Sequence, residues 1–310
     1  MASMSTAVVI PCYNEQSTIA GVVADFRREL PEAEVHVFDN NSTDGSDVIA
    51  LEAGARVHRV PTQGKGEVVR AMFREIDADV VVMVDGDATY PANRVRELLA
   101  PVIEGRADMV VGTRMQQYGS DSFRPLHVLG NNLVLQVINA FFGANLTDVM
   151  SGYRAFSRRF VKTMPVLSHG FEIETEMTLH ALEHRFPVVE VGVPYGERPE
   201  GSASKLHTFR DGLRVLGTIF RLYKDYRPMA FFGLLGLAFL ALGAAAGVLV
   251  TIEFLEYGQV IGVARAVLAV ACGIVGMLSL ATGAVLDTVN RRAREIYVLM
   301  ADHVIVRRRE

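Results

Sequence analysis

Roughly the first 200 residues alternate short apolar runs with amphipathic stretches. Runs rich in β-branched residues predict strands at Ala7–Ile10, Val35–Phe38, Arg56–Val60, Val80–Val84 and Met109–Val111. Between them, apolar residues at helical spacing predict helices over Ile19–Leu30 and Glu67–Ile76. Alternating strands and helices indicate an α/β fold with a mostly parallel sheet covered on both faces. Ligands of such sheets bind beyond the carboxyl ends of the strands, so we expect the functional residues there.

After residue 228 the pattern changes to long apolar stretches. Met229–Ile252 and Ala266–Leu286 contain no charged residue, and at ~1.5 Å per residue each helix would cross the ~30 Å hydrocarbon layer of a membrane. Two buried core helices are the alternative, but they need a larger core than this chain supplies. Basic residues flank the pair on its outer sides, at Arg221, Lys224, Arg227, Arg291, Arg292 and Arg294. By the positive-inside rule, we expect a transmembrane hairpin in the plasma membrane with both chain ends cytoplasmic.

The segment before the first apolar stretch, His207–Tyr226, places apolar residues at helical spacing among basic ones. This pattern predicts an amphipathic helix on anionic lipid headgroups, packed against the domain, or both. The expected parts of the chain are therefore an α/β domain (1–206), a juxtamembrane amphipathic helix (207–227), a transmembrane hairpin (228–287) and a cytoplasmic C-terminal tail (288–310).

Composition narrows the function classes. The chain is 50% hydrophobic and 21% charged, and its net charge of −4 gives no reason to expect nucleic-acid binding. Cys12 and Cys272 fall in different halves, which favours reduced packing residues over a disulfide or a metal site. The first apolar run is too short for a secretory signal and ends at Pro11, so we expect the α/β domain to stay on the side of synthesis.

The strongest candidate for chemistry is Asp85-Gly86-Asp87, directly after the strand Val80–Val84. Two carboxylates one residue apart can hold a divalent cation, and Mg²⁺ usually completes its shell with phosphate oxygens and water. Gly86 lets the backbone approach a ligand closely. The alternative is an acidic turn before a helix that begins near Pro91.

Other polar segments also lie at predicted strand ends. Pro11–Glu15 follows the first strand and Asp39–Asp44 the second. Acids there can accept hydrogen bonds from a base or a ribose, although a turn and helix cap explain Asp44 equally well. Gly64-Lys65-Gly66 opens a helix whose backbone donors, with Lys65, can meet an anion. The cations and hydroxyls of Arg198–Lys205 suit phosphate oxygens, or form a solvated loop.

Taken in order, these segments resemble family 2 glycosyltransferases of the dolichyl- or polyprenyl-phosphate sugar synthase type. The matching elements run over roughly residues 6 to 215 and comprise Ile10–Glu15, Asp39 with Asn41–Asp44, Gly64–Gly66, Asp85–Asp87, Gly112–Arg114, Ser151–Arg154 and Arg198–Lys205. The resemblance implies a GT-A, Rossmann-like catalytic domain over residues 1–206. It implies inverting transfer of one sugar from a UDP- or GDP-linked donor to polyprenyl or dolichyl phosphate, with Mg²⁺ or Mn²⁺, as in cell-envelope glycan synthesis.

The resemblance also assigns roles by position. The implied donor-binding residues are Pro11, Tyr13, Glu15, Asp39, Lys65, Asp85, Gly86, Asp87, Arg114 and Arg198. The implied residues at the acceptor phosphate are Arg124, Arg198, Ser204 and Lys205. Asp85 and Asp87 are the implied metal ligands, and the expected catalytic residues are Asp87, Arg114 and Asp148. Many relatives carry Gln where this chain has Thr89, which puts one part of the metal coordination in question.

The mechanism expected from these residues is electrostatic. A phosphate monoester has a second pKa near ~6 and is largely dianionic at neutral pH, so it needs no general base. Cations and the metal should then dominate catalysis. Asp148 is a candidate for positioning the acceptor, or for general-base work if the acceptor is a hydroxyl.

Several other functions compete with this interpretation. The alternatives are a membrane-anchored family 2 glycosyltransferase acting on another lipid or a glycan hydroxyl, and a non-enzymatic nucleotide-sugar-binding membrane module. A processive polysaccharide synthase typically carries a Gln-x-x-Arg-Trp motif, and this chain has no tryptophan. A sugar nucleotidyltransferase needs a Gly-rich, Arg-containing N-terminal loop, which Pro11–Glu15 is not. The first apolar stretch also carries small residues on which spans could associate, so a homo-oligomer is left open. These residues are Gly233, Gly236, Gly243 and Gly247.

Overall fold

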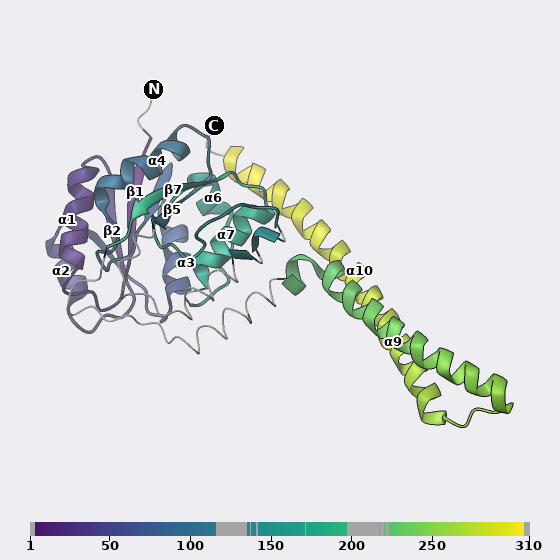
Figure 1. Ribbon diagram of the computed structural model, residues 1–310. Coiled ribbons are helices and arrows are strands. Elements are labelled where there is room, and N and C mark those ends of the chain that lie inside the picture. Colours follow the sequence, from purple (N-terminus) through teal and green to yellow (C-terminus); the bar gives the residue numbers. More distant parts are fainter. Residues whose placement is uncertain are drawn as a thin grey trace. The chain divides into compact units, whose positions relative to one another are not determined.

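The computed structural model of the chain describes residues 4–115, 135–136, 138–140, 142–170, 172–196, 217, 220 and 223–306. The chain divides into an α/β unit, which includes Met1–Val215, and a helical unit within Leu216–Asp302 (Figure 1).

Within the described residues, the α/β unit has one seven-stranded sheet with the order β3-β2-β1-β4-β6-β5-β7. The strands are β1 (Thr6–Cys12), β2 (Glu34–Asp39), β3 (Arg56–Arg59), β4 (Val80–Met83), β5 (Met109–Met115), β6 (Arg154–Ser157) and β7 (Val188–Pro194). All neighbours pair in parallel except β6, which runs antiparallel to both β4 and β5. The mostly parallel α/β sheet predicted from the sequence is confirmed, and β6 and β7 are additional to the five predicted strands.

Helices cover both faces of this sheet because successive side chains of a strand point to opposite faces. Val8 and Ile10 of β1 pack with α1 (Ile19–Glu29), whereas Ala7 and Val9 pack on the other side with α3 (Lys65–Glu75). The first face is completed by α2 (Ser46–Glu52) and α4 (Val95–Ile103), with the short 3₁₀ helix η1 (Ala92–Arg94) before α4. The second face is completed by α6 (Arg158–Thr163) and α7 (Ile173–Glu183). β4 is buried along its whole length, so the turn that follows it leaves from the centre of the sheet.

The helical unit contains the two long helices predicted to span a membrane. α9 (Pro228–Tyr257) and α10 (Val263–Val306) lie side by side as a hairpin, shown in green to yellow in Figure 1. Pro228–Tyr257 and Val263–Ala293 are long and apolar enough to cross a bilayer. α10 continues without a break to Val306, so most of the predicted tail is helical.

Glycines allow the two helices to approach closely. A Cβ at Gly236 would lie 2.8 Å from the Gly276 carbonyl oxygen, and one at Gly243 would lie 3.0 Å from the Ala269 carbonyl oxygen. Two of the four glycines predicted to form association faces are therefore used inside one chain. Of the predicted juxtamembrane helix 207–227, the structure describes 217, 220 and 223–227, and these are helical up to residue 226.

Candidate active site

The loops after β1 and β2 are joined by hydrogen bonds between side chains and backbone. The backbone N–H of Asn14 donates to Ser42 Oγ (2.9 Å), and the backbone N–H of Glu15 donates to Ser46 Oγ (2.9 Å). Asp39, at the end of β2, is 1% exposed and accepts from the Ser42 amide at 3.3 Å. Two residues predicted to contact a nucleoside, Glu15 and Asp39, therefore lie in loops that form one joined structure.

The loop after β1 also contacts the turn after β4. The Thr18 hydroxyl donates to the Gly86 carbonyl oxygen at 2.7 Å. A Cβ at Gly86 would lie 3.4 Å from the Pro11 carbonyl oxygen, so the two backbones pass close to each other. Tyr13, between these contacts, is 37% exposed. The structure thus brings the predicted donor-binding residues at the ends of β1, β2 and β4 together at one edge of the sheet.

The Asp85-Gly86-Asp87 turn holds its two carboxylates in different ways. Asp85 Oδ1 accepts from Lys65 Nζ at 2.7 Å. Asp85 Oδ2 lies against Gly152, where a Cβ would come within 2.1 Å of it. Asp87 is 3% exposed, and its Oδ1 accepts from Thr89 Oγ1 at 2.6 Å. The Thr89 hydroxyl therefore orients Asp87. Thr89 stands where many relatives carry Gln, and this hydrogen bond is its contribution to the predicted metal site.

The Gly64-Lys65-Gly66 turn differs from the expected anion site. Its amides are engaged within the protein, because Gly64 N donates to Asn40 Oδ1 (2.8 Å) and Gly66 N donates to the His169 carbonyl oxygen (3.1 Å). A Cβ at Gly64 would come within 2.2 Å of that same carbonyl oxygen. The glycines are thus required by close backbone packing, and Lys65 alone projects toward the predicted donor site.

Arg114 and Asp148, both predicted to be catalytic, bind each other. Arg114 Nε donates to Asp148 Oδ2 at 2.7 Å and its Nη2 donates to Oδ1 at 2.8 Å, which is a bidentate pair. Burial by itself would raise the pKa of Asp148, but the hydrogen bonds and charge of Arg114 outweigh it and hold that pKa below the ordinary value. An ionised carboxylate engaged at both oxygens is a poor general base, so this geometry favours a positioning role for Asp148.

The residues that follow β7 lie close to Thr89 and Arg114. Gly196, which follows β7, donates its amide hydrogen to the Thr89 carbonyl oxygen at 2.9 Å. The preceding residue, Tyr195, lies 5.6 Å from the Arg114 guanidinium carbon, measured to the ring centroid. The predicted phosphate-binding residues Arg124, Arg198, Ser204 and Lys205 lie outside the described residues.

Glu174 and Tyr90 at this edge were not predicted from the sequence, and Arg154 was part of the matching segment Ser151–Arg154 without an assigned role. The Glu174 carboxylate, at the start of α7, binds Lys65 at 2.5 Å. Tyr90 accepts from the Gly152 amide at 3.1 Å. Arg154 is fully buried and donates to the Val149 and Ser151 carbonyl oxygens, so it supports the segment that carries Asp148. The first turn of α7 contains two acids, Glu174 and Glu176, so its sequence contained no signal that singled out Glu174.

The donor set at the acidic turn fits a metal ion that is shared with a phosphate ligand. Among the described residues, no group of three or more His, Cys, Asp or Glu side chains is placed to hold a metal ion by itself. Asp85 and Asp87 supply two carboxylates, and Mg²⁺ is commonly bound by one or two carboxylates together with substrate phosphates. The pair therefore suits an ion that arrives with a diphosphate.

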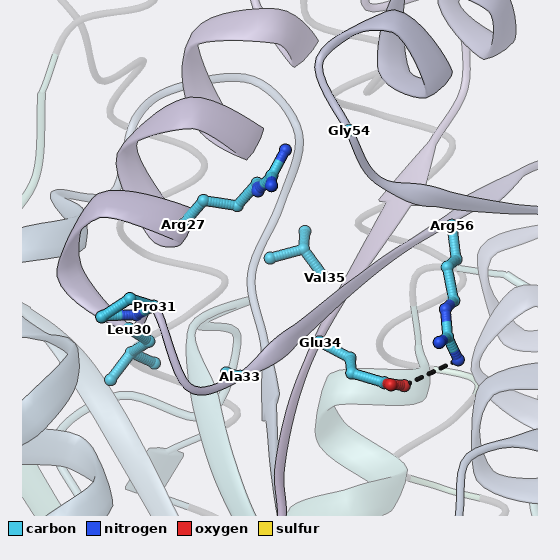
Figure 2. A pocket seen from close by; sticks show the side chains of 8 residues that line it. All are labelled: Arg27, Leu30, Pro31, Ala33, Glu34, Val35, Gly54 and Arg56. Carbon is cyan, nitrogen blue, oxygen red and sulfur yellow. Dashed lines mark hydrogen bonds and ion pairs between the residues drawn. The ribbon is translucent and has the colours of Figure 1, made fainter.

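A cavity elsewhere on the α/β unit contains none of the predicted site residues. Figure 2 shows it at the amino-terminal ends of β2 and β3, lined by Arg27, Leu30, Pro31, Ala33, Glu34, Val35, Gly54 and Arg56. Its two facing charges, Arg56 and Glu34, form an ion pair of 2.8 Å. It lies at the end of these strands opposite to Asp39 and the acidic turn.

Comparison with known proteins gives consistent matches. Residues 7–164 match the family described as Glycosyl transferase family 2. Glycosyltransferase AglJ of Haloferax volcanii is 36% identical over 251 residues, which cover 81% of this chain and 82% of that protein. The dolichyl-phosphate hexose transferase of the same organism is 29% identical over 221 residues, covering 71% and 95%. The fold also matches a crystal structure of glucosyl-3-phosphoglycerate synthase from Mycobacterium tuberculosis in complex with Mn²⁺, UDP-glucose and phosphoglyceric acid, with a TM-score of 0.54 and 22% identity over 73% and 79% of the two chains.

Proposed function

Because the chain belongs to glycosyl transferase family 2, we propose that it transfers one sugar from a nucleotide diphosphate sugar to a polyprenyl or dolichyl phosphate. The reaction inverts the anomeric carbon and takes place at the cytoplasmic face of a membrane. The similarity to a dolichyl-phosphate hexose transferase supports this acceptor. The two apolar helices support the membrane location.

One observation carries the proposal: the residues that follow β1, β4 and β7 lie together around the acidic turn. Thr18 links the predicted nucleoside loop to Gly86, and Gly196 links the end of β7 to Thr89. A nucleotide bound at the ends of β1 and β2 would therefore direct its diphosphate toward Asp85 and Asp87. The predicted phosphate-binding segment Arg198–Lys205 follows β7 in the sequence, and we propose that it brings the acceptor phosphate to the same turn.

In the proposed mechanism, Asp85 and Asp87 are the residues that would hold a divalent cation. When bound, such a cation would neutralise charge on the leaving nucleotide, and a protein of similar fold was crystallised with Mn²⁺. Arg114, positioned by Asp148, supplies a fixed positive charge beside the turn. Arg124, Arg198, Ser204 and Lys205 bind the acceptor phosphate.

The acceptor phosphate attacks the anomeric carbon in line with the leaving diphosphate. One phosphate oxygen forms the new bond to carbon, and the electron pair of the broken bond leaves with the nucleotide. Because the attacking oxygen is already anionic, no proton has to be removed. The main task of the protein is to bring two anions together, and fixed cations lower that cost most where water is excluded.

The proposal is tested with purified full-length protein in detergent. Polyprenyl phosphate, Mg²⁺ or Mn²⁺ and a panel of UDP- and GDP-linked sugars are supplied, and the lipid product is identified by mass and its anomer by NMR. We expect a polyprenyl-phosphate sugar of inverted configuration, lost on chelation of the metal and in Asp87→Asn. Asp47→Asn is the matched control, because Asp47, on α2, pairs with the exposed Arg59 of β3.

Other results would point to the alternatives. Transfer only to a lipid or glycan hydroxyl would replace the proposed acceptor. Nucleotide-sugar binding without transfer to any acceptor would favour a binding module.

A further inference from the structure

The ammonium group of Lys65 is shared between two carboxylates. Its Nζ lies 2.7 Å from Asp85 Oδ1 and 2.5 Å from Glu174 Oε1, and the Lys65 side chain is 12% exposed. Lys65 occupies the first turn of α3, where a positive charge opposes the helix dipole. The stability of α3 therefore does not explain this placement, and the two carboxylates do.

Glu174 is buried at the start of α7, with a side chain only 6% exposed. A glutamate is almost never buried to this extent unless it is paired. Glu174 and Lys65 come from helices more than a hundred residues apart in sequence, and Glu174 contacts the turn after β4 through Lys65. This arrangement fixes the direction from which Lys65 approaches Asp85.

The charges at this point decide how well the turn attracts a cation. Lys65 Nζ binds Asp85 Oδ1, so a lone Lys65–Asp85 pair would compete with a metal ion for that carboxylate. Glu174 shares the ammonium, and with both carboxylates ionised the three groups together carry a net negative charge. That charge lies beside Asp87, the second predicted metal ligand.

We propose that Glu174 is a positioning residue for the metal ion and the diphosphate. It holds Lys65 between two carboxylates, so that Asp85 and Asp87 retain enough negative charge to bind a divalent cation. The inference rests on the proposed function, because it concerns the cation and donor of that same site.

The test measures Mn²⁺ binding without turnover. Free Mn²⁺ is followed by electron paramagnetic resonance in titrations of the purified full-length protein, first alone and then with UDP or GDP. Glu174→Gln should bind Mn²⁺ about 10–100-fold more weakly, the usual effect of losing a residue that supports metal ligands. Glu172→Gln is the matched control, because it removes a carboxylate from the same end of α7 that bonds to the Gly170 amide instead of Lys65.

Lys65→Gln gives a second test of opposite sign. Without nucleotide, removal of the competing ammonium should leave Mn²⁺ binding at least as tight as in the wild type. A general loss of structure would weaken Mn²⁺ binding in both variants and lower both thermal midpoints, so opposite signs identify the electrostatic role. Lys65→Gln also keeps the inference testable if Glu174→Gln fails to fold.

Three results would overturn the inference. Wild-type Mn²⁺ affinity in a folded Glu174→Gln, or a tenfold loss in a folded Lys65→Gln, would refute the role of Glu174 and leave the proposed transferase activity intact. Failure of the wild type to bind Mn²⁺ with either nucleotide would refute both this inference and the metal site of the proposed function.

Discussion

Gly152→Ala adds one methyl group directly against the Asp85 carboxylate. A Cβ at this position would lie 2.1 Å from Asp85 Oδ2 and 2.6 Å from its Cγ, whereas ordinary contact begins at 3.4 Å. The carboxylate, the 151–153 backbone or both must therefore move by about 1.3 Å, the difference between 3.4 and 2.1 Å. Asp85 cannot simply swing away, because its other oxygen is bound by Lys65 at 2.7 Å.

The expected effect on activity follows from that displacement. A 1 Å error in positioning typically costs about 10²-fold in rate, so we expect transfer by Gly152→Ala to fall by about that factor. Packing an extra methyl group into a filled site should also cost about 1–3 kcal/mol of stability. Initial rates of lipid-linked product formation measure the loss of activity, and thermal unfolding measures the loss of stability. Mn²⁺ titration measures the effect on metal binding.

The matched control is Gly21→Ala in α1. A Cβ at Gly21 has nothing within 4 Å, and replacing glycine by alanine inside a helix stabilises by roughly 0.5–1 kcal/mol. Gly21→Ala should therefore keep the full rate and unfold at a slightly higher temperature. A Gly152→Ala protein with wild-type rate and Mn²⁺ affinity would refute the placement of Asp85 in the metal site.

Four further predictions concern other parts of the molecule. Asp148→Asn should reduce transfer less severely than Asp87→Asn in the same rate assay, because Asp148 positions Arg114 without acting as a base; an equal loss would contradict the base-free mechanism. Burial lowers the pKa of His180 from 6.5 to about 3, with a contribution from His184. As the pH falls, the unfolded chain therefore takes up this proton before the folded protein does. The free energy of unfolding should have its full value above pH 6.5 and be about 2 kcal/mol lower at pH 5. Denaturant unfolding at both pH values should show a smaller decrease for His180→Phe than for the wild type. Deletion of 228–310 should spare nucleotide binding, measured by calorimetry, and reduce transfer to long-chain lipid, and undiminished transfer would exclude a role of the hairpin in presenting the acceptor. A membrane-impermeant maleimide should label Gln259→Cys from outside intact cells, with Asp47→Cys as the unlabelled control. Burial, with a contribution from Asp39, raises the pKa of the native Cys12 to about 12 and keeps it unreactive. Labelling of Asp47→Cys instead of Gln259→Cys would overturn the expected topology.

Local sequence patterns were sufficient for the central strands and for the edge of the sheet that carries the candidate site. β1 and β4 are runs of apolar, mostly β-branched residues, and the structure extends or trims their predicted ends by only a few residues. Because parallel strands end at the same edge, Asp39 and the acidic turn were expected to lie near each other. Their linking contacts, through Ser42 and Thr18, agree with that expectation.

The ion pairs of the site were beyond the reach of local patterns. Arg114 binds a carboxylate 34 residues away, and the Lys65–Glu174 pair joins two separate helices. Propensity and periodicity describe one element at a time, whereas these pairs depend on the order of strands in the sheet. β6 was not predicted because it has only four residues and begins with an arginine, which normally indicates exposure.

The direction of β6 explains why these separate pairs form at one place. β6 lies antiparallel between β4 and β5, so its first residue, Arg154, is paired with Met83 near the end of β4 and with Val111 inside β5. The segment just before β6 therefore runs along the edge where β4 and β5 lead out of the sheet. It delivers Gly152 to Asp85 and Asp148 to Arg114. A parallel strand in this position would present its other end, and the contacts of Gly152 with Asp85 and of Asp148 with Arg114 would both be lost. The single reversed strand is thus what joins the acidic turn after β4 to Arg114 of β5 through one segment.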